Sequence, residues 1–309
     1  MTLMTSSPLS RTDAARGLDL ARRIAFASVA VNIVIALANV GIGLVAGSRA
    51  AVAAGIEFGA DAVAALLVYG GLVIAERPPD RDHPYGHGRA EILTGLILGV
   101  MLVLTGIAIA TQAVGDVWEI HAPPAAMAVV PLVAAAIVKG ALMALKFRVG
   151  RRVGSAALVA DAWNDTVDIL SAAAALTGLG LTLYDPQRFL AADHFGAFAV
   201  GLIVIGTGLM IVRNTSLELM DTMPPATLIA DIRAASHRVP GVRGVEKCWA
   251  RKTGLRYHVD LHLEVDPDMP VVEAHDIAER VRQQVRRDVL EVADVLVHIE
   301  PAPVAPPRA

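Results

Sequence analysis

The stretch DRDHPYGHGRAEIL, residues 80–93, places two Asp, two His, two Arg and a Glu between two apolar segments. Such a cluster stands out because 55% of the 309 residues are hydrophobic and the mean hydropathy is +0.55. That composition is too apolar for an ordinary soluble domain, and apolar runs of about 20 residues can cross a bilayer as helices. We therefore expect residues 80–93 to form a polar loop between two membrane-spanning helices.

Six segments have the length and composition of membrane spans. Three carry no charge and three carry charged residues within the apolar run: 24–46, 92–115 and 195–212, and then about 50–75, 122–145 and 155–182. Lys and Arg gather in the N-terminal arm and in the loops after the second and fourth spans, where Lys146 is counted as a loop residue. Because positive residues stay on the cytoplasmic side, both termini and residues 80–93 are predicted to be cytoplasmic.

The region after about residue 214 is charged and predicts a small α+β domain. Residues 257–265, YHVDLHLEV, alternate strictly between apolar and polar, which indicates a strand with one buried face. The expected elements are a helix at 225–238, strands at 244–252 and 255–265, a helix at 270–290 and a strand at 293–299. The predicted organisation is a flexible arm (1–20), a six-helix transmembrane domain (21–213), a cytoplasmic domain (214–300) and a disordered tail (301–309).

Composition and motifs argue against several classes of partner. The formal net charge of −3 gives no reason to expect nucleic acid. A single cysteine, Cys248, rules out an internal disulfide and zinc sites built on several cysteines. The chain has no phosphate-binding loop of the GxxxxGKS or GxxxxGKT type, so a nucleotide is not expected. The polar N-terminus lacks a small-residue cleavage pattern, and no signal peptide is expected.

Acidic residues lie inside two of the predicted spans. Glu57 and Asp61 are four residues apart in the second span and share one helix face. The fifth span contains DAWNDTVD, in which two pairs remain open: Asn164 with Asp168, or Asp161 with Asp165. Charged groups at membrane depth are costly and usually mark ion or proton pathways. If the two spans touch, four oxygen-bearing side chains would form a divalent-cation site. The alternative is that a single carboxylate is the structural partner of Lys139.

These features together resemble the cation diffusion facilitator family of divalent-metal/proton antiporters. The motifs that carry the resemblance are HPYGHGRAE (83–91) after the second span, the acidic pair of that span, ADAWNDTVD (160–168) and a C-terminal αββαβ arrangement. The resemblance covers about residues 20–300. It implies an α-helical, multi-pass protein of the bacterial inner or plasma membrane with six transmembrane helices. It also implies a metallochaperone-like cytoplasmic α+β domain that regulates transport and forms a homodimer.

The resemblance assigns a transport site within the membrane. Its four ligands match Glu57, Asp61, Asn164 and Asp168, which leaves Asp161 and Asp165 as neighbours of the site. Zinc-transporting members usually have a His in this tetrad, and none is present here. Carboxylate and carbonyl oxygens suit harder cations than imidazole does. We therefore expect Mn²⁺ or Fe²⁺ as the substrate, with Zn²⁺, Co²⁺ and Ni²⁺ as the remaining candidates.

Two further metal sites follow from the resemblance. One is in the cytoplasmic loop, at Asp80, His83 and His87, with Asp82 as a substitute ligand; the alternative is that these His only form hydrogen bonds that fix the loop. The other site is in the cytoplasmic domain, and its matching residues are Glu246, His262, His298, Glu300 and, nearby, His275. The alternative is that these residues only form a solvated polar face of the strands. Arg89 and Asp221 match a pair that would brace the membrane domain against the cytoplasmic domain.

The function that these features predict is secondary active export of a divalent transition-metal cation in exchange for protons, with membrane lipid as the surroundings. Divalent metal ions would be the substrate and also regulatory ligands. Two alternatives remain open. One is a non-transporting member that acts as a metal sensor or heterodimer partner. The other is an intramembrane metalloenzyme, against which the absence of His from the predicted spans argues. No enzymatic activity is expected.

Overall fold

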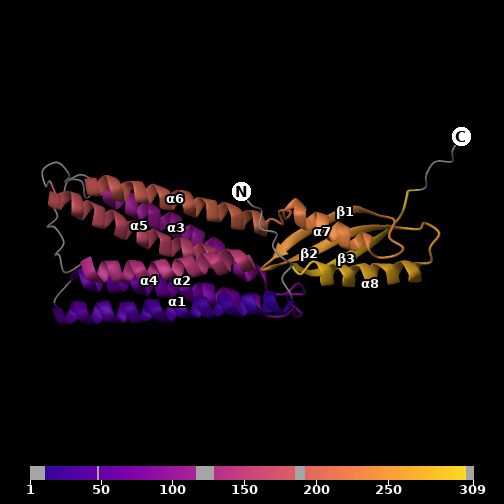
Figure 1. The fold of residues 1–309 in the computed structure, drawn as a ribbon, viewed down its shortest axis with the longest axis horizontal. Helices are drawn as coiled ribbons and strands as arrows, with labels where there is room; N and C mark the ends of the chain where they lie inside the picture. Colours follow the sequence, from indigo (N-terminus) through magenta and orange to yellow (C-terminus); the bar gives the residue numbers. More distant parts are fainter. Residues whose placement is uncertain (1–10, 47–48, 116–128, 185–191, 304–309) are drawn as a thin grey trace. The chain divides into compact units, whose positions relative to one another are not determined.

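The computed structural model describes residues 11–46, 49–115, 129–184 and 192–303 (Figure 1). Six long helices come first and a small α+β domain follows, as the fold class predicts. The helices are α1 (Arg11–Ala46), α2 (Arg49–Ala75), α3 (Arg89–Gly115), α4 (Val129–Val153), α5 (Ala156–Tyr184) and α6 (Ala192–Leu219). The domain consists of α7 (Ala226–His237), β1 (Gly244–Thr253), β2 (Arg256–Val265), α8 (Val271–Asp288) and β3 (Val292–Pro301).

The chain divides into two compact units. The helical unit contains Gly17–Pro78 and Ala90–Ser216, and the second unit contains the loop Pro79–Arg89 together with Leu217–Ala309. The polar loop therefore groups with the cytoplasmic domain, although about 130 residues separate them in the sequence. This grouping is a feature of the tertiary structure that residue order alone does not show.

Four segments of the described helices are long and apolar enough to cross a membrane: Asp19–Gly41, Gly55–Ala75, Arg89–Val114 and Phe198–Leu219. Several helix boundaries differ from the sequence prediction, and α6, for example, continues to Leu219, past the predicted end of its span at 212. Helix α1 begins at Arg11, so the arm predicted to be flexible over 1–20 is helical from Arg11 onward. Helix α4 continues to Val153, past the predicted end at 145. Lys146 is therefore part of a helix and fully buried, and its assignment to a loop was wrong.

Helices α3 and α6 approach each other closely through glycines spaced seven residues apart. These are Gly99 and Gly106 on α3, and Gly201 and Gly208 on α6. A methyl group placed at Gly106 would lie 2.8 Å from the backbone nitrogen of Ile205, and one at Gly208 would lie 2.8 Å from that of Val103. The hydrophobic effect does not drive helices together in lipid, because the lipid tails are as apolar as the side chains. Small residues at the contact instead let the helix backbones pack tightly. The seven-residue spacing places them on one stripe of each helix.

The second unit contains a three-stranded sheet in the order β1-β2-β3. Strands β1 and β2 form an antiparallel hairpin, and β3 adds in parallel to β2 after the α8 crossover. The predicted alternation in β2 is confirmed, because Val259, Leu261 and Leu263 are at most 1% exposed and belong to one core. Burying a Val or Leu side chain contributes about 1.5–3 kcal/mol, so this face of β2 anchors the domain.

Helix α8 covers the core with an amphipathic face. Its buried residues, Ala274, Ile277, Val281 and Val285, recur every three or four positions, which is the spacing of one helix face. Strand β3 continues to Pro301, and the Ala302 backbone N–H donates to the Val265 carbonyl at 2.8 Å. Order therefore extends past the predicted boundary at 300, whereas residues 304–309 of the predicted tail lie outside the described residues.

Candidate metal sites

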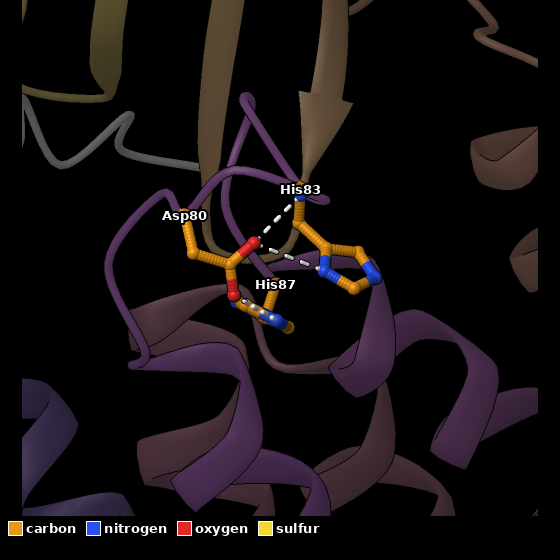
Figure 2. A group of neighbouring side chains, drawn as sticks. All are labelled: Asp80, His83 and His87. Carbon is orange, nitrogen blue, oxygen red and sulfur yellow. Dashed lines mark hydrogen bonds and ion pairs between the residues drawn. The ribbon is translucent and has the colours of Figure 1, made fainter.

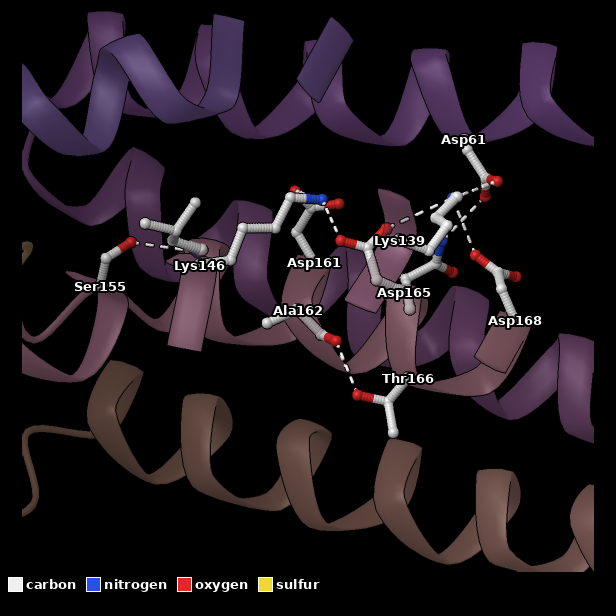
Figure 3. Close-up of polar contacts among 11 residues, drawn as sticks. Asp61, Lys139, Lys146, Ser155, Asp161, Ala162, Asp165, Thr166 and Asp168 are labelled. Atoms are coloured by element: carbon white, nitrogen blue, oxygen red, sulfur yellow. Dashed lines mark hydrogen bonds and ion pairs between the residues drawn. The ribbon is translucent and has the colours of Figure 1, made fainter. Parts of the chain in front are cut away.

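Helices α4 and α5 pack against each other and carry a matched set of charges. Lys139 and Lys146 are seven residues apart on α4, and Asp161 and Asp168 are seven apart on α5, with Asp165 between them. The order of contacts is reversed, since Lys139 meets Asp168 and Lys146 meets Asp161. Figure 3 shows the two ammonium groups alternating with the carboxylates along the helices. Buried charges need such partners, because a lone ion in a low-dielectric interior is strongly unfavourable.

Three of the four predicted transport ligands lie together. Helix α2 packs against α5, and the Asn164 amide donates to Asp61 Oδ1 at 2.8 Å. Lys139 Nζ connects Asp61 with Asp168, because it lies 2.7 Å from Asp61 Oδ2 and 2.8 Å from Asp168 Oδ2. The fourth residue is not part of this group. Glu57 is exposed, and among the described residues it has no hydrogen bond or ion pair with the other three.

Asp161 and Asp165 belong to a second polar group, next to the first. Lys146 Nζ lies 2.8 Å from Asp161 Oδ2 and 2.6 Å from Asp165 Oδ2, and the lysine is fully buried. Asp165 Oδ1 also lies 3.3 Å from Lys139 Nζ, so one carboxylate faces both ammonium groups. Of the two pairs that the α5 sequence left open, Asn164 with Asp168 reaches Asp61 of α2 and Lys139 of α4, whereas Asp161 with Asp165 contacts Lys146 of α4.

Sequence reasoning missed the extent of the lysine contacts. Lys139 was considered only as the partner of a single carboxylate, yet its ammonium contacts three. Lys146 was counted with Arg148, Arg151 and Arg152 in the loop after the fourth span. The matching seven-residue spacings in neighbouring predicted spans were the available signal. Lysines seven apart on one helix and aspartates seven apart on the next can pair when the helices run antiparallel.

The loop between α2 and α3 brings its three predicted ligands together (Figure 2). Asp80, His83 and His87 each offer a ligand atom, and these atoms lie within 4.8 Å of one another. Asp80 Oδ1 accepts the His83 backbone N–H at 2.7 Å, and its Oδ2 lies 3.4 Å from His87 Nε2. A glycine is needed within this turn, because Gly86 has a φ of 81°.

Two properties make the loop suitable for a cation. The backbone N–H of His83 is the main cause that holds the pKa of Asp80 below its ordinary value, so the carboxylate is charged at neutral pH. Within the described residues, the buried Nδ1 atom of His87 has no hydrogen-bond partner. Buried polar atoms normally have a partner, and an orphan at such a site calls for an explanation. Carboxylate and imidazole together form a ligand set that divalent transition metals accept.

The same loop is seated on the β1–β2 hairpin of its unit. A methyl group placed at Gly88 would lie 2.6 Å from the Thr253 carbonyl oxygen, so only glycine fits there. The Tyr85 ring lies 5.4 Å from the Arg251 guanidinium. Arg89 donates to Asp221 at 2.5 Å, and side chains of both are more than 40% exposed. Both partners of this predicted pair belong to the unit that contains the cytoplasmic domain.

The third predicted group lies on the polar face of the sheet in the second unit. His262 on β2 and His298 on β3 are register partners, and His262 Nδ1 lies 2.5 Å from Glu300 Oε1. Ligand atoms of these three lie within 4.8 Å of one another. A hydrogen bond with Glu246 and then one with His262 keep the pKa of Glu300 below its ordinary value. His275 is exposed on α8 and is not one of this group.

Comparisons with known proteins identify the family. The model of the cation efflux transmembrane domain matches residues 25–220, and that of the cation efflux protein cytoplasmic domain matches residues 224–302. The chain therefore belongs to the cation diffusion facilitator family, as its motifs predicted. It is a multi-pass membrane protein and a metal cation efflux transporter rather than an enzyme.

Several relatives are similar over most of the chain. The manganese efflux system protein MneP of Bacillus subtilis is 28% identical over 92% of this chain and 97% of its own length. The magnetosome protein MamB of a Magnetospira species is 29% identical over 85% of this chain and 89% of its own. A solved structure of MamM-CTD is 34% identical over 25% of this chain and 96% of its own, with a TM-score of 0.24.

Proposed function

We propose that this protein exports Mn²⁺, with Fe²⁺ as the second choice, from the cytoplasm in exchange for protons. The observation that carries the proposal is the meeting of Asp61, Asn164 and Asp168 between α2 and α5, inside the helical unit. Their side chains offer carboxylate and amide oxygens, which suit harder divalent cations. Such groups at membrane depth usually belong to an ion pathway.

The ion preference rests on two further points. None of the residues that contact Asp61 or Asp168 in the described structure is a His, whereas imidazole would favour Zn²⁺, Co²⁺ or Ni²⁺. The relative MneP is named as a manganese efflux system protein. Glu57 lies one helical turn from Asp61 on α2 and is the proposed fourth ligand, while the described hydrogen bonds and ion pairs join the other three residues.

Proton exchange follows from the chemistry of the ligands. A carboxylate binds a divalent cation only when it is deprotonated, so metal loading and protonation exclude each other at the same oxygens. If protons reach Asp61 and Asp168 from outside as the metal leaves, the two fluxes are coupled without ATP. This direction requires the termini and the loop 79–89 to be cytoplasmic, as the distribution of Lys and Arg suggests.

The other two groups are proposed as regulatory sites. A divalent cation at Asp80, His83 and His87 would fix the loop that rests on the β1–β2 hairpin. A cation at His262, His298 and Glu300 would bind on the sheet, with Glu246, which interacts with Glu300, as a further candidate ligand. We further propose that the cytoplasmic domain forms the homodimer, so that metal bound there favours one arrangement of the two copies.

Flux measurements with purified protein in liposomes test the proposal. The liposomes hold a pH-sensitive dye and a metal-sensitive dye, and Mn²⁺, Fe²⁺, Zn²⁺, Co²⁺ and Ni²⁺ are supplied in turn. We expect Mn²⁺ flux with opposite proton flux, both lost in Asp168→Asn and retained in Asp231→Asn, which changes an exposed carboxylate of α7. Flux of Zn²⁺ in preference to Mn²⁺ would overturn the ion assignment. Metal flux without proton flux would overturn the exchange.

The sensor or heterodimer alternative gives a different result. A protein of that kind would bind metal in detergent but would move none of the five ions across the liposome membrane. The contacts of Asp61, Asn164 and Asp168 favour transport, because a sensor has no need of ligands between membrane helices.

A further inference from the structure

The ammonium group of Lys139 occupies the centre of the proposed transport site. Its Nζ lies 2.7 Å from Asp61 Oδ2, 2.8 Å from Asp168 Oδ2 and 3.3 Å from Asp165 Oδ1, and the side chain is 2% exposed. An ammonium carries three N–H donors and no acceptor, and here each can face a carboxylate. A divalent cation would be held by the same oxygens of Asp61 and Asp168. The lysine and the metal therefore cannot occupy them together.

Lys139 has another partner available when the metal arrives. Asp165 is 1% exposed and lies next to the site on α5, where its Oδ1 faces Lys139. The flexible four-carbon stem of a lysine lets its charge move while the backbone stays in place. A small displacement toward Asp165 would release Asp61 and Asp168 and keep the ammonium paired. Lys146 cannot play this part, because its contacts are with Asp161 and Asp165 alone among the described residues.

We propose that Lys139 is a tethered cation, one that holds the transport site when metal is absent and withdraws to Asp165 when metal enters. The inference rests on the proposed transport function of Asp61 and Asp168. It explains how the unloaded site avoids bare carboxylates inside the membrane, which would be strongly unfavourable. It also gives the release step a chemical basis, since the returning ammonium competes with the departing metal for the same oxygens.

A purely structural role for Lys139 predicts the opposite effect on metal affinity. If the lysine only orients the carboxylates, its removal weakens metal binding or leaves it unchanged. If it competes, removal tightens binding. When a site is competent only about a tenth of the time, its apparent dissociation constant is about tenfold weaker than the intrinsic one. We therefore expect Lys139→Met to bind Mn²⁺ about tenfold more tightly and to release it more slowly than the wild type.

The experiment measures free Mn²⁺ by electron paramagnetic resonance during titration of the purified full-length protein in detergent. Asp168→Asn identifies the fraction that binds at the transport site. Lys139→Met leaves an acidic group without its partner, so Lys139→Met/Asp165→Asn is measured as well, because it removes one charge of each sign. Lys146→Met/Asp161→Asn is its matched control on the same two helices, since it also removes one charge of each sign.

Tighter Mn²⁺ binding in the Lys139 variants, with no tightening in the Lys146 control, supports the tethered cation. If the single variant does not fold, the double variant decides by the same criterion. Unchanged or weaker binding in a folded Lys139 variant overturns the inference and leaves the transport site standing. If the wild type shows no Mn²⁺ binding that depends on Asp168, the proposed site itself is wrong and the inference fails with it.

Discussion

Lys146 provides a direct test of how the buried charges stabilise the helical unit. Its ammonium is fully buried and lies within 2.8 Å of both Asp161 and Asp165. At an effective dielectric constant of about 20, a pair of charges about 4 Å apart attracts by about 4 kcal/mol. Desolvation of all three groups offsets most of that gain in the intact protein. Lys146→Met removes the attraction but leaves the two carboxylates buried without their partner, so we expect the unfolding free energy to fall by about 3–5 kcal/mol.

Thermal unfolding in detergent, followed by size-exclusion chromatography, measures this loss. With about 2–4 °C per kcal/mol for a unit of this size, Lys146→Met should lower Tm by about 6–20 °C. Arg148→Met is the matched control, because Arg148 lies on the same helix and is exposed. Lys146→Met/Asp161→Asn should recover part of the loss, since it restores the balance of charge. A change in Tm of less than about 2 °C in the single variant would refute the reasoning.

Three further predictions concern the second unit. Leu261→Ala removes a fully buried side chain from the central strand and should cost about 2–5 kcal/mol of unfolding free energy in denaturant titration, whereas an effect below about 1 kcal/mol would contradict the assigned core. Gly88→Val should increase protease cleavage of the loop 79–89, because the valine side chain would collide with the Thr253 carbonyl. Gly206→Ala is the control, since there is open space around Gly206, and it should leave cleavage unchanged. Equal cleavage of the two variants would argue against the close contact at Gly88. Burial is the largest single influence on the pKa of Asp294 and acts to raise it. Two hydrogen bonds from Arg282, at 2.8 and 2.9 Å, outweigh burial only together with the Val295 backbone N–H and the positive charges of Arg282 and Arg286, and the pKa is lowered. The pair therefore stabilises the folded domain above the ordinary Asp pKa of about 4 and loses this effect as the pH falls below it. Arg282→Met should lower the unfolding free energy at neutral pH by less than about 1 kcal/mol, because the pair is exposed. This difference from the wild type should vanish in acid, and a difference that persists there would contradict the assignment.

Local patterns were sufficient for the elements whose burial follows a simple period. In β2 the alternation of apolar and polar residues predicted the face formed by Val259, Leu261 and Leu263, because successive side chains of a strand point to opposite faces. Uncharged runs predicted α1, α3 and α6 for a similar reason, since only apolar residues suit the bilayer. The end of α4 was mistaken, because a lysine near three arginines resembles a loop when its partners on α5 are not known.

The candidate sites also differ in whether local sequence or tertiary structure brings their residues together. Asp80, His83 and His87 are close in sequence, and a turn with a glycine at residue 86 suffices to bring them together. His262 and His298 are far apart in sequence, and parallel register between β2 and β3 makes them neighbours. The i, i+4 spacing placed Glu57 and Asp61 on one helix face, but it could not say which of them points toward α5.

The sequence by itself determined the six helices, the α+β domain, the family and the residues that can carry charge within the membrane, because each depends on composition or on a short repeat. Tertiary structure decided which of those charges meet. Lys139 of α4 contacts Asp61, Asp165 and Asp168 because α2 and α4 both pack against α5. Pairing among buried charges depends on the register between helices, and that register is set by the packing of whole helix faces rather than by the spacing of residues along any one of them.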